Sequence, residues 1–517
     1  MKRTAALCVA VFTLASLLGM GVAKAAPAYV FRVGAAVEDI TPDAMPCADY
    51  PGPCFPDNKG VWLGGYGLGA AHRQSNGVVD HRISARAMVI ANHAGNTLAF
   101  AMNETQGMFA AYQQGPYGLD DARRQINLAT GIPMNHIVLG SDHSHASVDT
   151  TFVWGGVPDN YLKFIHDQII KSVVAAYHNQ VPATISVGSF DDPGYDGDQL
   201  GIPGAPDQDY VDKTIRVLQA KRMSAHGKPA GNAVVTFIEA PFHPTSYGSS
   251  HSSSGTSSID SDWPGRVADW AASNFGGIGV GWEGDIGRQG SDGGEGRIEA
   301  AALSAMGTTM TPITDGTIDG RVQLMTEEIT NPVYIWFLNG ARLAAPVLCA
   351  GGADVNQPYG TPPAIQGGGL SLCSPTPRAN TLPYGAVATS GLWATTFRIG
   401  DVLFSGGPGE VYPNLAETVR QTIPGARHFY LGLAQDQVGY IIGPATQWPA
   451  VVAVRDAEGN DNGLFNGGPT IGDHLVCEHI IAAAAMGFTA VNVPSYCAVV
   501  TASDPVSSAL ADQYGLS

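Results

Sequence analysis

Two histidines separated by one residue, His143 and His145, follow the apolar run of residues 137–139. Because residues two apart on an extended chain project to the same side, both imidazoles would point to one place at the carboxyl end of a buried strand. Open α/β sheets bind their ligands at that end of their strands. The pair therefore predicts a metal-ligating site, and the alternative is two histidines that are simply hydrogen-bonded where a strand ends.

Three further residues with metal-ligating or proton-donating side chains also follow apolar runs: His243, Glu410 and Tyr440. Since strands of one sheet end close together, we expect these side chains to lie near the histidine pair. Two imidazoles and a carboxylate with one open position form a catalytic zinc set, and a tyrosine oxygen can complete it. Each residue also has a plainer interpretation. His243 would only end a strand, Glu410 would only be a first-turn carboxylate that interacts favourably with a helix dipole, and Tyr440 would only be a core or surface residue.

The elements that would position these residues are strands alternating with helices. β-rich runs bounded by turn residues predict strands, and amphipathic spacing predicts helices. The predicted strands are residues 30–33, 83–90, 97–102, 137–139, 185–190, 215–221, 233–242, 278–282, 396–404 and 428–433. The predicted helices are residues 119–128, 160–177, 262–272, 411–421 and 471–486. This order predicts the α/β fold class, with a mixed β-sheet core flanked by helices, many loops, and the metal site at the carboxyl ends of strands.

The composition is that of a large, loop-rich globular protein. The chain has 517 residues, with 65 glycines, 34 prolines and only 14% charged residues. This length predicts one large domain or two merged ones, and the residue content is unlike that of a disordered or fibrous protein. The formal net charge is −18 and no basic residues cluster, which argues against nucleic acid as a partner.

The first 25 residues have the features of a signal peptide. Lys2 and Arg3 precede an apolar run over residues 5–18, and Ala23 and Ala25 fit the small-residue rule for cleavage. A retained membrane anchor is the alternative, but the apolar run is short for a membrane span. We therefore expect a secreted or periplasmic protein with no transmembrane segment in the mature chain.

Six cysteines remain after cleavage, and an even number in an exported protein indicates disulfide bonds. Proximity along the chain favours pairs between residues 47 and 54, 349 and 373, and 477 and 497, although six cysteines allow many other pairings. No Cys-x-x-Cys spacing occurs, so zinc ligation by cysteine is not expected.

Several short motifs, taken together and in order, resemble those of the neutral/alkaline, non-lysosomal ceramidase family. Residues 141–146 are similar to its Gly-Thr-His-Thr-His-Ser segment, residues 242–245 to its His-Pro-Thr, and residues 408–410 to its Pro-Gly-Glu. Residues 33–41, 63–66, 81–87 and 432–441 resemble further blocks of the family. The resemblance covers residues 30–445, with long unmatched loops between the motifs.

The resemblance implies that His143, His243, Glu410 and Tyr440 hold one zinc ion, with His145 beside it. It also implies a single large catalytic domain over residues 26–517, which attacks the amide bond of an N-acyl sphingoid lipid with a zinc-bound water. In that mechanism His145 carries protons and Tyr440 donates to the oxyanion. A lipid substrate further implies transient contact with a membrane surface.

The chain departs from the family in places that bear on catalysis. Gly287 stands where the family has a serine with a proposed catalytic role, so a zinc-water mechanism is retained and a serine acyl-enzyme is not. Asp285, in the same segment, is expected to be structural unless it orients His143 or His145. The loops over residues 190–200 and 443–449 also differ, and we expect no C-terminal immunoglobulin-like domain.

These departures leave two alternatives to ceramide hydrolysis open. One is a zinc hydrolase for a different amide or ester. The other is a catalytically silent relative that binds a lipid or a glycan, for which the glycine at position 287 is the main argument.

Overall fold

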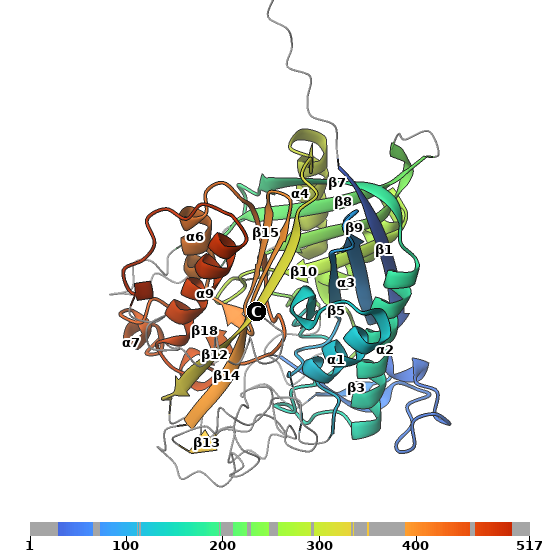
Figure 1. The fold of residues 1–517 in the computed structure, drawn as a ribbon. Coiled ribbons are helices and arrows are strands. Elements are labelled where there is room, and N and C mark those ends of the chain that lie inside the picture. The colour runs from blue at the N-terminus through green and yellow to red at the C-terminus, as the bar shows by residue number, and fades with distance from the viewer. Residues whose placement is uncertain are drawn as a thin grey trace, which may run out of the picture.

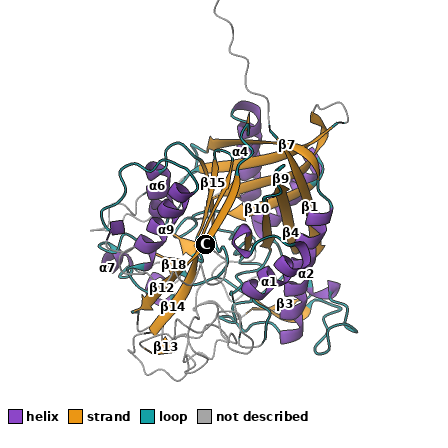
Figure 2. Ribbon diagram, in the orientation of Figure 1, coloured by secondary structure: helices purple, strands orange, loops and turns teal. Residues whose placement is uncertain are grey.

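The computed structural model contains two β-sheets packed face to face, with helices on both outer faces (Figure 1). Figure 2 shows the same layers by secondary structure, with the strands enclosed between groups of helices. The structure describes residues 29–498, except for residues 66–72, 111, 113–114, 196, 198–209, 225–228, 248–256, 291–293, 332–333, 335–348, 351–387 and 455–460.

The larger sheet is mixed, because the β9–β10 and β5–β6 pairs are parallel and its other pairs are antiparallel. Its strands, in spatial order, are β10 (Ile278–Glu283), β9 (Pro229–Ala240), β8 (Thr214–Met223), β7 (Val181–Asp191), β1 (Val30–Asp39), β4 (Ser84–Ala91), β5 (Thr97–Asn103) and β6 (Ile137–Ser141), with β11 (Thr311–Pro312) beside β7. β10 also lies against β4 and β5, which are distant in this order, so the sheet curls.

The smaller sheet consists of β12 (Ile318–Ile329), β14 (Ala388–Ile399), β15 (Val402–Gly406) and β17 (Arg427–Leu431), with β13 (Cys349–Ala350) beside β14. Two short ladders complete the strands: β2 (Lys59–Leu63) pairs with β3 (Arg73–Asn76), and β16 (Glu410–Val411) pairs with β18 (Tyr440–Ile441). β16 follows β15 within a few residues, so it places Glu410 just beyond the carboxyl end of that strand.

An aromatic and aliphatic core fills the space between the two sheets. The ring of Phe100 lies 5.2 Å from that of Phe404, and the ring of Phe237 lies 6.0 Å from that of Phe429, between centroids. Both faces of the larger sheet are buried, because its other face packs against helices. The helices there are α1 (Leu119–Thr130), α2 (Asp159–His178), α3 (Asp262–Phe275) and α4 (Gly294–Thr308). The outer face of the smaller sheet packs against α6 (Pro413–Thr422) and α9 (Ile471–Ala485), with the short α7 (Trp448–Val451) and α8 (Asp461–Leu464) nearby in sequence.

The predicted fold class is confirmed, with the refinement that the core contains two sheets. The single strand predicted over residues 396–404 is wrong, since the chain turns at Gly400, with φ of 59°, and forms the β14–β15 hairpin. The helix predicted over residues 411–421 begins at Pro413, because Val411 belongs to β16. The sequence does not predict β12, because charged residues interrupt its apolar pattern. It does not predict α4 either, because glycine and alanine dominate that segment.

Two of the three predicted disulfide bonds are confirmed, Cys47–Cys54 and Cys477–Cys497. Cys373 of the third pair lies outside the described residues, as does the predicted signal peptide. Among the described helices none has the length and apolar character to cross a bilayer.

Candidate metal centre

The His-x-His pair stands immediately beyond β6, as the sequence predicts. The loop over residues 432–439 docks on this strand, where the Gln435 backbone amide donates to the Leu139 carbonyl and its side-chain amide donates to the Ile137 carbonyl. His143 itself adopts a left-handed backbone conformation, with φ of 57°. That conformation costs a residue with a β-carbon about 1–2 kcal/mol, and such strain is typical of functional sites.

The other predicted ligands come from the ends of different strands. His243 follows β9, and Glu410 follows β15 through a glycine-rich turn and opens β16. β16 and β18 are parallel, with Glu410 directly opposite Tyr440. Because paired residues in a ladder project to the same face, the side chain of Tyr440 lies on the same face as that of Glu410.

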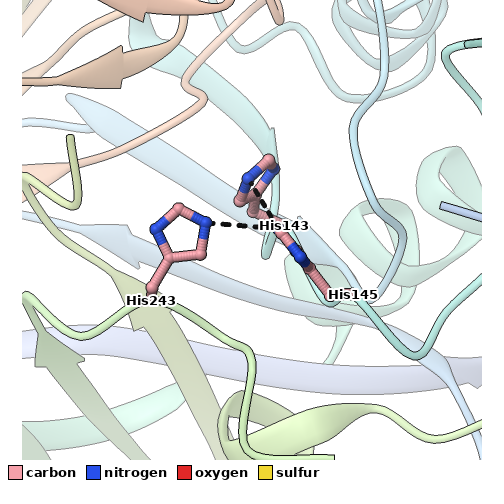
Figure 3. A group of neighbouring side chains, drawn as sticks. All are labelled: His143, His145 and His243. Carbon is pink, nitrogen blue, oxygen red and sulfur yellow. Dashed lines mark hydrogen bonds between the residues drawn. The ribbon is translucent and has the colours of Figure 1, made fainter. Parts of the chain in front are cut away.

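Three imidazoles, those of His143, His145 and His243, converge on one point (Figure 3). The carboxylate of Glu410 lies beside them. The Nε2 atom of His145 lies 3.1 Å from Nε2 of His143 and 3.2 Å from Nε2 of His243. The Glu410 carboxylate lies 3.5 Å from Nε2 of His143 and 3.9 Å from Nε2 of His243. We call these four side chains the imidazole cluster.

Burial keeps the three rings in their neutral form. His143 is 3% exposed and His145 6% exposed. Loss of solvent lowers the pKa of His143 and of His243 to about 4. It also lowers the pKa of His145 well below its ordinary value, with help from the two neighbouring rings. At neutral pH the rings therefore carry no charge, and each can offer a nitrogen lone pair to a cation.

Backbone carbonyls fix the orientation of two of the three rings. The Nδ1 atom of His143 donates to the Gln106 carbonyl at 2.9 Å, which leaves the lone pair on Nε2 facing the cluster. His243 hydrogen-bonds to the backbone of Ile286. Metal-ligating histidines have such partners for their second nitrogen, since the partner sets the tautomer and the ring direction.

The cluster has the donor set and spacing of a site for one metal ion, and a tetrahedral zinc ion gives a scale for comparison. Four ligands around a tetrahedral zinc ion, with bonds of about 2.1 Å, lie about 3.4 Å apart. Three of the four measured separations, 3.1, 3.2 and 3.5 Å, match this value, and the His243–Glu410 separation of 3.9 Å is slightly longer. Two of the matching separations involve His145, so the geometry allows this residue as a ligand too. Nitrogen and carboxylate donors together are those that zinc prefers in catalytic sites.

The ring and the backbone of His145 are also fixed by contacts with neighbouring residues. A β-carbon on Gly65, where φ is +89°, would lie 2.3 Å from Cγ of the His145 ring, so only glycine allows this approach. Arg73 donates to the His145 carbonyl at 2.6 Å and to the Gly64 carbonyl at 2.7 Å. Gly64 and Gly65 belong to the block of residues 63–66 that resembles the ceramidase family, and its last residue, Tyr66, lies outside the described residues.

Asp285 contacts neither histidine of the pair, in agreement with the structural role expected for it. Its carboxylate accepts from Arg420 at 3.1 Å. It belongs to a buried group of two arginines and three acids, which we call the arginine–carboxylate cluster: Asp212, Arg216, Glu239, Asp285 and Arg420. The two clusters are adjacent, because Ile286, which hydrogen-bonds to His243, follows Asp285 directly.

The structure gives a physical reason for the glycine at position 287. A β-carbon there would lie 2.7 Å from the carbonyl oxygen of Glu410 and 2.9 Å from the amide nitrogen of Tyr412. The Gly287 amide also donates to the Val411 carbonyl at 2.9 Å. The segment thus packs directly on the backbone that carries Glu410, and a serine side chain has no room.

Sequence reasoning missed the contribution of Gln106. This residue lies in the polar run after the predicted strand 97–102, which is the same signal that marks His143. Its contact with His143 uses the backbone carbonyl, which any residue type supplies, so side-chain chemistry does not reveal it.

Comparisons with known proteins identify the fold. No protein-family model matches the chain, and no curated protein sequence matches it. The structure of neutral ceramidase from Pseudomonas aeruginosa is similar, with a TM-score of 0.59 and 17% identity over 89% of this chain and 75% of that chain. A ceramidase complexed with C2 is similar with a TM-score of 0.60 and 16% identity, over 90% of this chain and 78% of that chain. The chain therefore has the fold of the neutral ceramidases.

Proposed function

We propose that this protein is a zinc-dependent hydrolase that cleaves the amide bond of an N-acyl sphingoid or a related lipid. The observation that carries the proposal is the convergence of three neutral, buried imidazoles and the Glu410 carboxylate at strand ends. The likeness of the fold to two ceramidase structures supports the choice of substrate class.

In this proposal His143, His243 and Glu410 hold the ion, and Tyr440 completes the set from the strand beside Glu410. When bound, zinc polarises the carbonyl of the substrate and lowers the pKa of a water molecule from about 15.7 toward 7. The carbonyl of Gln106 and the backbone of Ile286 keep the two rings aimed at the ion. Burial excludes bulk water, which strengthens the electrostatic interactions inside the site.

His145 is the residue that moves protons in this scheme. Its Nε2 lies within hydrogen-bonding distance of the other two rings, so it borders the place where a substrate carbonyl would bind. A neutral imidazole there can accept a proton from the attacking water and return it to the leaving amine. Tyr440 can donate its hydroxyl hydrogen to the oxygen that becomes negatively charged.

A serine acyl-enzyme is not part of the proposal. The position that carries the family's serine is Gly287, which packs against the backbone of Glu410. A water nucleophile needs no group at this position, so the loss of the serine is compatible with hydrolysis.

We further propose that the protein is exported. The predicted signal peptide supports this, and the Cys47–Cys54 and Cys477–Cys497 disulfide bonds are typical of oxidising compartments outside the cytosol. Mass determination of the protein isolated from its host tests cleavage near Ala25.

A substrate screen tests the proposed activity. Purified protein would be assayed with short- and long-chain N-acyl sphingoid amides, other N-acyl amides and matched esters, each with and without a chelator. We expect chelator-sensitive hydrolysis of N-acyl sphingoid amides at the highest rate. Faster hydrolysis of another amide or of esters would favour the second candidate, a zinc hydrolase of different specificity, which the altered loops 190–200 and 443–449 motivate. No turnover of any compound would favour the silent lipid- or glycan-binding relative.

A further inference from the structure

A cavity of about 330 Å³ lies at the edge of the smaller sheet, apart from the residues of the imidazole cluster. It is bordered by the ends of β7 and β11, the start of β8 and β17, and the end of α6. β17 is the last strand in the order of its sheet and pairs with β15 on one side. The cavity therefore wraps around an edge strand.

The walls of the cavity are basic in a strongly acidic protein. Arg216, Arg420 and Arg427 line it together with His428, whereas the chain as a whole has a formal charge of −18. Among the described residues that line it none carries a carboxylate. Hydroxyl groups and short apolar side chains make up much of the remaining wall. An anion is the ligand whose charge complements such a surface.

Each guanidinium group is anchored from behind by a carboxylate. Arg216 pairs with Asp212 at 3.0 Å, and Nη2 of Arg420 pairs with Asp212 at 2.7 Å. Arg427 pairs with Asp401 at 2.6 Å through Nη2 and donates from Nη1 to Thr311. Long, flexible side chains are thereby held in one arrangement before a ligand arrives, which lowers the entropy cost of binding.

Several nitrogens on these lining side chains are buried and have no hydrogen-bond acceptor. They are Nε and Nη1 of Arg420, Nε of Arg427 and Nδ1 of His428. The closest carboxylate to Nη1 of Arg420 is that of Glu417 at 3.7 Å, which is too far for a hydrogen bond. When Nε2 of His428 accepts a hydrogen bond from the Ser405 hydroxyl, the ring is in the tautomer with its hydrogen on Nδ1, so Nδ1 is a donor. Buried donors normally have an acceptor, so these side chains keep hydrogen-bonding capacity for a ligand or water.

We propose that this cavity binds a phosphate group, either as inorganic phosphate or as a phosphate monoester. The unused donors belong to side chains on α6 and on successive residues of β17, which project to opposite faces of that strand. A tetrahedral oxyanion presents acceptors in several directions, as this arrangement requires, whereas a carboxylate presents them in one plane. Arginine is also the residue whose planar fork suits phosphate oxygens.

The size and position of the cavity allow a substituent on the phosphate. Its volume lies near the lower limit for small-molecule sites, which is about 300 Å³. Arg427 is only partly buried, and Thr309 and Thr311 beside it are exposed, so this side of the cavity opens to solvent. The inference does not depend on the proposed hydrolase activity.

Isothermal titration of the whole protein with inorganic phosphate tests the inference. The variant Arg427→Gln removes one unused donor at the open side of the cavity, and Arg427→Lys keeps the charge but not the fork. The control is Arg82→Gln, since Arg82 pairs with Asp39 and Asp43 on the surface and does not line the cavity. Unfolding midpoints of all variants would be compared first, so that a folding defect is recognised.

We expect one phosphate per chain, with affinity about tenfold weaker in Arg427→Gln, as for the loss of one charge-assisted hydrogen bond, and unchanged in Arg82→Gln. Arg427→Lys should also bind more weakly than the wild type. Tighter binding of glycerol 3-phosphate than of inorganic phosphate would identify a monoester as the ligand, and the reverse order would identify free phosphate. Equal affinity of the wild type and Arg427→Gln, as for phosphate held at the imidazole cluster, would overturn the inference. Absence of binding to the wild type at millimolar concentration would do the same.

Discussion

The imidazole cluster and the arginine–carboxylate cluster are neighbours that treat burial in opposite ways. In the first, three rings of the same kind meet one carboxylate, and loss of solvent lowers the pKa of His143 and His243 to about 4. In the second, two arginines alternate with three acids, and Arg216 and Arg420 share Asp212. Both groups are largely buried, and their most exposed side chains, those of His243 and Arg420, are only 11% and 13% exposed.

The difference shows which cluster needs a cation from outside the chain. Opposite charges in the arginine–carboxylate cluster compensate one another, so its ion pairs act structurally without a metal, although two nitrogens of Arg420 remain without an acceptor. The Nε2 atoms of His143 and His243 both lie within 3.2 Å of Nε2 of His145. Neutral imidazole nitrogens at this spacing compete for the same hydrogens and are best satisfied by a cation. Substitutions that exploit this contrast test the account.

The largest effect is expected from His143→Ala. Loss of this ring removes a nitrogen ligand and the group that faces Glu410, so bound metal should fall from about one ion per chain to nearly none, and hydrolysis should be lost with it. Metal analysis after dialysis and an amide hydrolysis assay would measure both. His178→Ala, at an exposed helix end, is the control and should keep both. Unchanged metal content in His143→Ala would remove the basis for the assigned ligands.

Arg420→Gln should destabilise the fold without removing a metal ligand. It leaves Asp212 and Asp285 without one of their buried partners, and breaking a buried ion pair in this way costs about 3–5 kcal/mol. Urea denaturation would measure the change. The folded fraction should still bind metal, in contrast to His143→Ala. A loss below about 1 kcal/mol would contradict the structural role of this cluster.

His145→Gln separates proton transfer from metal binding within the imidazole cluster. If His145 carries protons, the rate of hydrolysis falls by about 10²–10⁴-fold while the metal remains bound. Steady-state kinetics and metal analysis on the same sample distinguish the two roles. Loss of the metal together with activity would make His145 a ligand and would correct the assignment proposed above.

Gly287→Ser should weaken the site, although it restores the residue type of the family. A β-carbon at this position meets the backbone of residues 410–412, and such overpacking costs about 1–3 kcal/mol. We expect lower stability and weaker metal binding, with no gain in hydrolysis. Gly425→Ser is the control, because nothing lies within 4 Å of a β-carbon there. A faster enzyme after Gly287→Ser would show that the serine has room to act.

The last effect concerns pH. Burial raises the pKa of Glu239 to about 8 from an ordinary value of 4.5, against the opposing effect of Arg216. Between pH 4.5 and about 8, Glu239 is protonated in the folded protein and ionised in the unfolded chain. The unfolded chain therefore binds fewer protons, and this residue makes the free energy of unfolding fall as pH rises through that range. Glu239→Gln cannot titrate, and its unfolding free energy should fall less steeply over that range in urea titrations. Contributions from the imidazoles are common to both proteins and cancel. Identical slopes would refute the shift.

The parts of the site that sequence predicted are those with a local signal. The histidine pair follows the apolar run that forms β6, and His243 follows β9, so their positions after strands could be predicted from period-two patterns. Glu410 and Tyr440 instead open the short strands β16 and β18, which no such pattern indicates. Glycine at 287 was noted as a departure, but its packing against Glu410 requires the folded chain.

The parts that sequence missed depend on contacts between distant residues. Gln106 lies 37 residues from His143, and Arg420 lies 135 residues from Asp285, so no local pattern links either pair. The β14–β15 hairpin was missed because both of its strands are apolar and only Gly400 and Asp401 mark the turn. Because this hairpin forms the centre of the smaller sheet, the sequence does not predict a second sheet either.

Titration of metal-depleted protein with zinc tests the central claim most directly. Hydrolysis of an N-acyl sphingoid amide would be measured after each addition of zinc to the wild-type chain. The account predicts no activity at the start, a linear rise, and a plateau at one zinc ion per chain. Activity that is already complete without metal, or that never appears at any zinc concentration, would contradict it.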